Sequence, residues 1–143
     1  MLGEEIFMGA GMMVVTTIIH AMFMVAGIRV TEWKVSRFGQ ARSETKRAVL
    51  ISAFTVWMFL AIVIEAWLWA VLYLVHPGIT VLPGLETSFY FSMVTFTSLG
   101  YGDIVLPGKW RTLASIQAAN GVIVFGWTTA LIFDFIQRMY KKA

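Results

Sequence analysis

The chain has 143 residues, of which 59% are hydrophobic and only 13% are charged, and its mean hydropathy is +0.78. A soluble domain carries about 25% charged residues, so this composition predicts an integral membrane protein. No cysteine is present, which excludes disulfides and thiol chemistry, and the net charge is a modest +3.

Three apolar segments, residues 6–28, 49–75 and 113–136, are long enough to span a bilayer. Each exceeds the roughly 20 residues that cross about 30 Å of hydrocarbon. The first also resembles the apolar core of a signal peptide. However, Glu4 and Glu5 precede it in place of a basic region, and it lacks a clear small-residue cleavage pattern. We therefore interpret it as a retained helix.

The basic residues predict the orientation of these spans. They gather after the first span (Arg29, Lys34, Arg37, Arg42, Lys46 and Arg47) and after the third (Arg138, Lys141 and Lys142). The positive-inside rule places both groups in the cytoplasm and the N-terminus outside, and we expect the cell (inner) membrane. Because topology accounts for these residues, no nucleic-acid partner is indicated. The first group also contains Trp33 and Phe38, and it is either a solvated loop or an interfacial helix that binds anionic membrane lipids.

Two ionisable residues lie inside the spans, His20 in the first and Glu65 in the second. Such groups are costly at this depth, so they usually face protein and find partners. A direct pair is one arrangement, but a rise of 1.5 Å per residue from the helix ends separates the two by roughly 10 Å. The alternative is a protonated Glu65 bonded to a hydroxyl of Ser88, Ser92 or Thr95. Both residues are then structural hydrogen-bonding groups, or one of them responds to pH.

The segment between the second and third spans contains a short helix. His76-Pro77-Gly78 and Pro83-Gly84 are turn sequences, and residues 86–96 between the second turn and the next glycines are rich in Phe, Tyr, Ser and Thr. About 11 residues are too few to cross a bilayer. We predict a re-entrant helix whose negative C-terminal end favours a cation near the centre of the membrane.

A glycine-containing motif follows this helix: Thr97, Ser98, Leu99, Gly100, Tyr101, Gly102 and Asp103. A dehydrated potassium ion needs its water shell replaced by oxygens, which stacked backbone carbonyls of four chains around one axis supply. Gly100 and Gly102 tolerate the left-handed backbone angles that turn successive carbonyls inward. A hydroxyl of Ser98 or Thr97 supplies the innermost oxygens. The alternative is an ordinary turn, but non-helical backbone at membrane depth has to be buried in protein or line an aqueous path.

In this context residues 49–138 resemble the two-helix pore module of the potassium channel family, the pore-loop tetrameric cation channels. The order is outer helix, pore helix, selectivity filter and inner helix, and the whole chain more loosely resembles small three-helix bacterial ion-channel proteins. The resemblance implies a homotetramer that binds K⁺ at its filter carbonyls, with no cofactor. Ser98 stands where the family usually has Thr, and Leu99 where it has Val, which affects the degree of selectivity and removes no ion-facing oxygen.

The resemblance also assigns positions around the filter. Tyr90 and Phe91 lie where the family has an aromatic cuff, and the Tyr90 hydroxyl either bonds Asp103 or the region of Tyr101 in a neighbour, or both rings simply pack. Asp103 either attracts cations at the outer mouth or caps a turn, or does both. Val94 replaces a glutamate that pairs with the filter aspartate in some bacterial channels, so inactivation linked to that pair is expected to be absent or altered.

In the third span, Gly121 and Gly126 resemble the hinge of the family's inner helix, although glycine also permits close helix packing. Alignment on Gly121 directs five side chains toward the cavity: Ala118, Val122, Phe125, Thr129 and Phe133. Phe133 is then a hydrophobic constriction near the inside, while Gln117 and Asn120 suggest a somewhat rotated pore face. Asp134 is expected to pair with Arg138, four residues further on.

The sequence thus predicts an all-α membrane protein with three transmembrane helices, a re-entrant pore helix and a filter. Residues 1–48 form an N-terminal helix with its basic loop, and residues 49–143 form the pore module. The expected function is passive, potassium-selective conduction. The alternatives are a weakly selective monovalent cation channel and a non-conducting partner or sensor with a pore fold. No nucleophile–base set, metal-ligand cluster, phosphate loop, arginine-rich voltage sensor or cytoplasmic ligand domain is evident, so neither an enzyme nor a gating stimulus is indicated.

Overall fold

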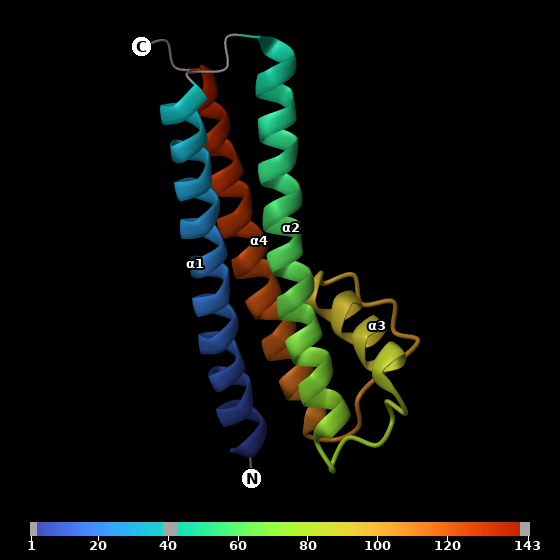
Figure 1. Ribbon diagram of the computed structural model, residues 1–143. Coiled ribbons are helices and arrows are strands. Elements are labelled where there is room, and N and C mark those ends of the chain that lie inside the picture. Colours follow the sequence, from blue (N-terminus) through green and yellow to red (C-terminus); the bar gives the residue numbers. More distant parts are fainter. Residues whose placement is uncertain (1–2, 39–42, 141–143) are drawn as a thin grey trace.

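The computed structural model describes residues 3–38 and 43–140, with side chains for 3–33 and 43–140. It contains four helices: α1 (Glu4–Phe38), α2 (Glu44–Val75), α3 (Leu85–Phe96) and α4 (Trp110–Tyr140). The long helices α1, α2 and α4 lie side by side, and the short α3 packs against α2 near the end of the bundle where α1 begins (Figure 1). By length and composition, three of the helices in the described part of the chain can cross a membrane, which agrees with the predicted all-helical protein with three spans.

The long helices extend beyond the predicted spans. α1 continues through Phe38, so Trp33 is helical, and much of the segment predicted as a basic loop belongs to α1. Arg42, Lys141 and Lys142 lie outside the described residues, as do the side chains of Lys34 and Arg37.

The main core lies where α2, α3 and α4 meet. Buried Trp69 and Tyr73 of α2 pack with Phe91 and Phe96 of α3 and with Leu113 of α4. Because lipid tails are as apolar as these side chains, close packing and interhelical hydrogen bonds hold such a bundle together. This core fixes α3 against the two helices on which it leans.

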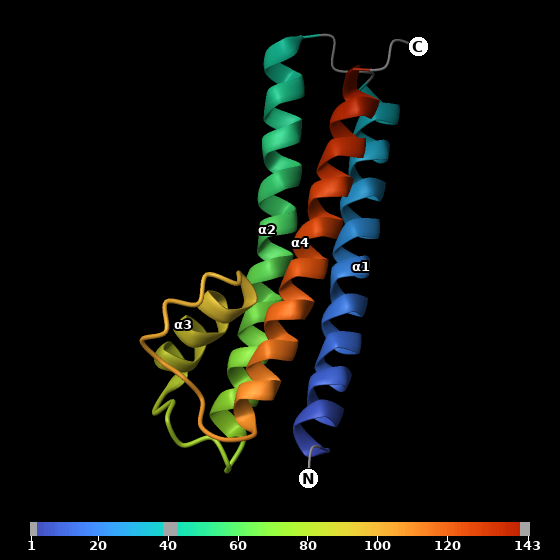
Figure 2. The ribbon, with the colours of Figure 1, turned by 180° about the vertical axis from the view of Figure 1, so that it is seen from behind.

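α1 covers α2 and α4 on the side away from α3, as the view from behind shows (Figure 2). Small residues allow the close approach: a Cβ at Gly9 would lie 2.8 Å from Ile116 Cδ1 of α4, and one at Gly27 would lie 2.9 Å from a ring carbon of Phe54 of α2. α1 is therefore an integral layer of the bundle.

The opposite end of the bundle, where α2 begins and α4 ends, has its own contacts. The rings of Phe54 and Phe135 stack with their centroids 4.5 Å apart. Tyr140 donates a hydrogen bond to Glu44 Oε2 (3.2 Å). The predicted pair is also confirmed, since Arg138 Nε donates to Asp134 Oδ2 at 2.7 Å. The Phe54–Phe135 and Tyr140–Glu44 contacts tie the end of α4 to α2, and the Arg138–Asp134 pair lies within α4.

Candidate functional site

The short helix α3 lies against α2 and α4 at the side of the bundle, and the chain then returns to the end at which α4 begins (Figure 1). A buried chain of hydrogen bonds holds α3 in place. Ser92 Oγ donates to the Ala66 carbonyl of α2 (2.5 Å) and accepts from Gln117 Nε2 of α4 (2.7 Å). Tyr73 of α2 completes the chain by donating to Gln117 Oε1 (2.8 Å). α3 is thus bonded to both of its neighbours at one level.

This arrangement corrects the prediction of a rotated pore face. Gln117 and Asn120, which suggested it, are both buried inside the chain. Gln117 holds α3, and Asn120 Nδ2 donates to Thr16 Oγ1 of α1 (2.7 Å). Amides in an apolar helix signal a polar partner, but only the packing of the helices reveals which partner it is.

We expect replacement of Gln117 by leucine to destabilise the protein by about 1–3 kcal/mol for each buried polar group left without a partner. In this variant the Tyr73 hydroxyl loses its partner, while the Ser92 hydroxyl loses one of its two bonds and keeps the one to the Ala66 carbonyl. Thermal unfolding in detergent measures the loss, and Tyr73→Phe should cost less because it removes one bond only. Ser115→Ala, on an exposed position of the same helix, is the matched control. Equal unfolding temperatures for all three variants would contradict the bracing role.

Gly121 lies where α4 passes the carbonyl end of α3. A Cβ at this position would stand 1.8 Å from the Phe96 carbonyl oxygen and 2.7 Å from its carbonyl carbon. No side chain larger than hydrogen fits there, and α4 is helical without interruption from Trp110 to Tyr140. Of the two interpretations of this glycine, the structure supports close packing. Gly126 is different, because a Cβ added there would have no neighbour within 4 Å.

Residues 97–103 leave α3 with an alternating backbone. Ser98, Gly100 and Gly102 have φ values of 58°, 52° and 78°, while Leu99 and Tyr101 between them have negative φ. The positive values at the two glycines agree with the prediction, whereas the one at Ser98 was not predicted. A non-glycine residue with positive φ is uncommon, which makes Ser98 a point of backbone strain.

The beginning of this segment folds back onto the end of α3. Leu99 N and Gly100 N both donate to the Val94 carbonyl, at 3.0 and 3.2 Å, and Ser98 N donates to the Thr95 carbonyl at 2.9 Å. Thr97 Oγ1 donates to the Met93 carbonyl at 2.8 Å. Hydrogen bonds to the last carbonyls of α3 therefore fix the beginning of the segment, through three backbone amides and the Thr97 hydroxyl.

The predicted cuff residues face different directions. Tyr90 OH donates to Asp103 Oδ2 at 2.7 Å, and this bond, together with the charge of Asp103, raises the pKa of Tyr90. The protonated phenol is therefore the form that the bond to Asp103 favours. Phe91 is buried and meets the Tyr73 ring edge-on, with 5.2 Å between centroids. Phe91 is thus part of the core, whereas Tyr90 contacts Asp103, directly after the Gly100–Gly102 segment.

A continuous stripe of α4 is exposed in the single chain, on the side opposite Gln117. It comprises Ser115, Ala119, Val122, Gly126, Thr129 and Phe133. The predicted cavity face needs one correction here. Val122, Thr129 and Phe133 lie on the stripe, whereas Phe125 is half-buried against Phe96 and Ala118 is half-buried. Leu99 and Tyr101 are also exposed, by 57% and 67%.

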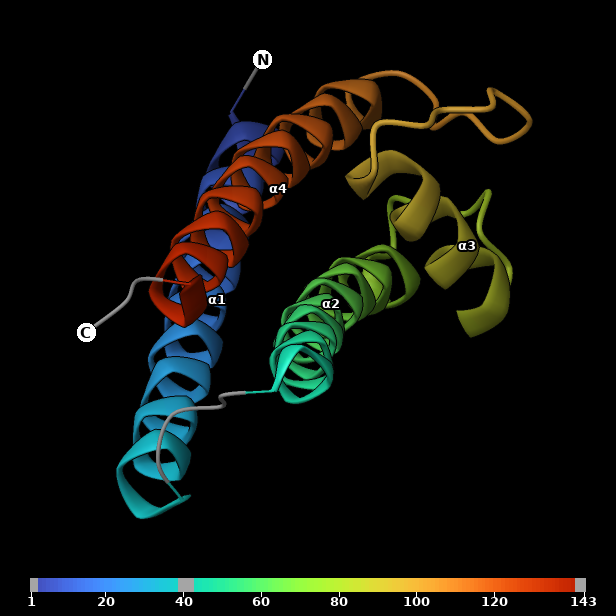
Figure 3. The same ribbon diagram turned by 90° about the horizontal axis from the view of Figure 1, so that it is seen from above.

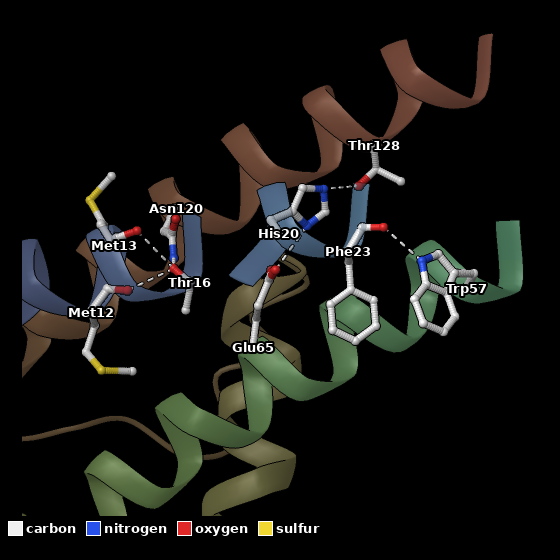
Figure 4. A network of polar contacts seen from close by, with 9 residues as sticks. All are labelled: Met12, Met13, Thr16, His20, Phe23, Trp57, Glu65, Asn120 and Thr128. Carbon is white, nitrogen blue, oxygen red and sulfur yellow. Dashed lines mark hydrogen bonds and ion pairs between the residues drawn. The ribbon is translucent and has the colours of Figure 1, made fainter. Parts of the chain in front are cut away.

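His20 and Glu65 meet directly, contrary to the helix-rise count (Figure 4). His20 Nδ1 lies 3.0 Å from Glu65 Oε1, and His20 Nε2 lies 3.1 Å from Thr128 Oγ1 of α4. The count took both helices as upright, but α1 is inclined to α2 (Figure 3). Side chains also lean toward the N-terminus of their own helix, so in these antiparallel helices the two residues lean toward each other. The predicted bonds from Glu65 to Ser88, Ser92 or Thr95 are wrong.

Comparison with known proteins identifies the class. A protein-family model described as "Ion channel" matches residues 47–138, which include nearly all of α2 and α4 and the whole of α3. This match covers more than half of the chain, and the chain therefore belongs to this ion-channel family. The comparisons with curated proteins and with solved structures gave no significant match. The three candidate membrane spans and the family match together indicate an integral membrane protein of the ion-channel class. α1 is a further helix that precedes the matched region.

Proposed function

We propose that four copies of this chain form a potassium-selective channel. Backbone carbonyls of residues 97–102 bind the ions, and a hydroxyl of Ser98 or Thr97 supplies the innermost oxygens. Potassium then passes down its electrochemical gradient, and no cofactor takes part. The N-terminus lies outside the cell membrane and the C-terminus in the cytoplasm, as the basic residues indicate.

The observation that carries this proposal is the alternation of φ along residues 98–102. A residue of positive φ at every second position reverses the turn of each successive peptide plane. This reversal is what a row of carbonyls facing one axis requires, and potassium filters replace the hydration shell with such rows. An ordinary turn has no need of three positive values, least of all one at a serine.

The exposed surfaces support assembly around an axis. One chain contributes one row of carbonyls, which cannot enclose an ion, so further copies are needed. Tyr101 is a large aromatic side chain that is 67% exposed in the single chain. The exposed stripe of α4 is mostly small and contains Thr129, as suits a helix that lines an aqueous path. We assign this stripe to the pore and Phe133 to its constriction.

Ion flux through purified protein in liposomes tests the proposal, with potassium gradients, sodium gradients and barium as a filter blocker. We expect potassium flux that barium blocks and little sodium flux. Equal passage of both ions would favour a weakly selective cation channel, which Ser98 and Leu99 make the leading alternative. An absence of flux for both ions would favour a non-conducting subunit. Protein-free liposomes provide the baseline.

A further inference from the structure

We propose that His20, Glu65 and Thr128 form a proton-binding site through which α1 controls the position of α4. The three side chains come from α1, α2 and α4, and His20 bridges the other two (Figure 4). His20 and Glu65 are fully buried, and Thr128 is 7% exposed. Each long helix of the bundle thus contributes one member to a site that water does not reach in this structure.

The site is electrically isolated. α1 packs against α2 and α4 and not against α3 within the described part of the chain. The only charged residue of α2 between Arg47 and His76 is Glu65, and α4 has none between Arg111 and Asp134. The α4 groups that face His20 are the Thr128 hydroxyl and the Trp127 ring, whose centroid is 5.5 Å away. Among the described residues, no second ion pair is available there to absorb a change of charge.

The number of bound protons therefore decides the net charge of the site. With one proton, His20 and Glu65 are together neutral, either as an ion pair or as two neutral groups. A second proton has a place to bind, because Glu65 Oε2 is buried and has no hydrogen-bond partner among the described residues. It leaves a net positive charge in an apolar interior, which is strongly unfavourable. Separation of the helices lets water enter and solvate the charge, which lowers this free-energy cost.

This separation acts on the helix that carries the exposed stripe. Thr128 is next to Thr129, and it lies on the face of α4 opposite Gly126 and Phe133. The whole of α1 lies outside the matched family region, which starts at residue 47. Release of Thr128 from His20 frees this part of α4 from α1 while Gln117 still holds α3. At acid pH we therefore expect this part of α4 to move away from α1.

Nitrogen NMR of labelled histidine tests proton binding without any use of conduction. The chain has two histidines, so His76→Gln leaves only the signal of His20. In full-length protein in nanodiscs, we expect the His20 ring signals to change between about pH 8 and pH 5, because a second proton changes the charge of the His20–Glu65 pair and the hydrogen bond that joins them. Glu65→Gln, which keeps the shape and an acceptor oxygen, should move the midpoint. A His20 signal that is constant over this range would overturn the site.

Flux measurements over the same pH range test the coupling, which rests on the proposed conduction. We expect wild-type flux to rise about five- to tenfold on the acid side, within the range usual for coupled sites. His20→Gln and Glu65→Gln should flatten this response. Thr16→Val is the matched control, because it removes a different α1–α4 hydrogen bond, the one to Asn120, which involves no titratable group. His76→Gln controls for the pair of His76 with Glu4. Both controls should retain the response.

The two readouts separate the possible failures. A titrating His20 with flux that is flat or falls in acid, or a His20→Gln variant that keeps the wild-type response, overturns the control of α4. Flux that is absent at every pH contradicts the proposed function, and the NMR titration then still decides whether the proton site exists. Size-exclusion chromatography of each variant shows that the fold and assembly are retained.

Discussion

Replacement of Gly121 by alanine is expected to abolish ion flux and to lower the stability of the protein. The added Cβ would stand 1.8 Å from the Phe96 carbonyl oxygen, and this neighbour is backbone at the end of α3. Overpacking of this kind costs about 1–3 kcal/mol and sometimes more. It exceeds the gain of up to about 1 kcal/mol that alanine brings to a helix. The displaced segment is the one that leads into residues 97–103, so flux should fall further than stability.

Gly126→Ala is the control that separates packing from hinge bending. Its added Cβ meets nothing within 4 Å, so it changes helix flexibility and not contacts within the chain. We expect its unfolding temperature to be unchanged or slightly higher. Flux in liposomes and thermal unfolding in detergent measure both variants. A Gly121→Ala protein that conducts normally, beside a Gly126→Ala protein that does not, would favour a hinge at Gly126 and contradict the packing role of Gly121.

The second large effect is expected at Gly100. Its φ of 52° lies in the left-handed region, where a Cβ costs about 1–2 kcal/mol. In the proposed tetramer this strain occurs four times, about 4–8 kcal/mol in total, which is comparable with the whole stability of many domains. Gly100→Ala should therefore lose the proposed potassium-selective flux. Comparison of potassium and sodium flux in liposomes measures the change.

Ser98 provides the matched pair for this experiment. Ser98→Gly relieves the left-handed strain at φ 58° and should keep the flux, although it removes a hydroxyl. Ser98→Thr restores the residue usual in potassium filters, yet we expect it to reduce flux, because β-branched residues are outliers at positive φ. Two outcomes would contradict the proposal that the carbonyls of this alternating backbone bind the ions. One is wild-type selectivity in Gly100→Ala, and the other is a higher flux in Ser98→Thr than in Ser98→Gly.

Much of the fold followed from local properties of the sequence. Runs of apolar residues predicted the three long helices, and turn sequences on either side of residues 86–96 predicted α3. The need for positive φ at Gly100 and Gly102 followed from the chemistry of a filter and the absence of a Cβ. These features depend on hydrophobicity, length and backbone freedom, each of which a short stretch of sequence determines.

The tertiary structure decided how the helices meet. Helix tilt and rotation bring His20 to Glu65, Gln117 to Ser92 and Gly121 to Phe96, and they turn Phe125 toward the core. Nothing in a single helix specifies such contacts, since they depend on the angle at which two helices cross and on the direction in which side chains lean. The sequence by itself determined three helices long and apolar enough to span a membrane and a glycine-containing loop between the last two. Packing between the helices decided which polar groups support that loop and which ones tie α1 to α4.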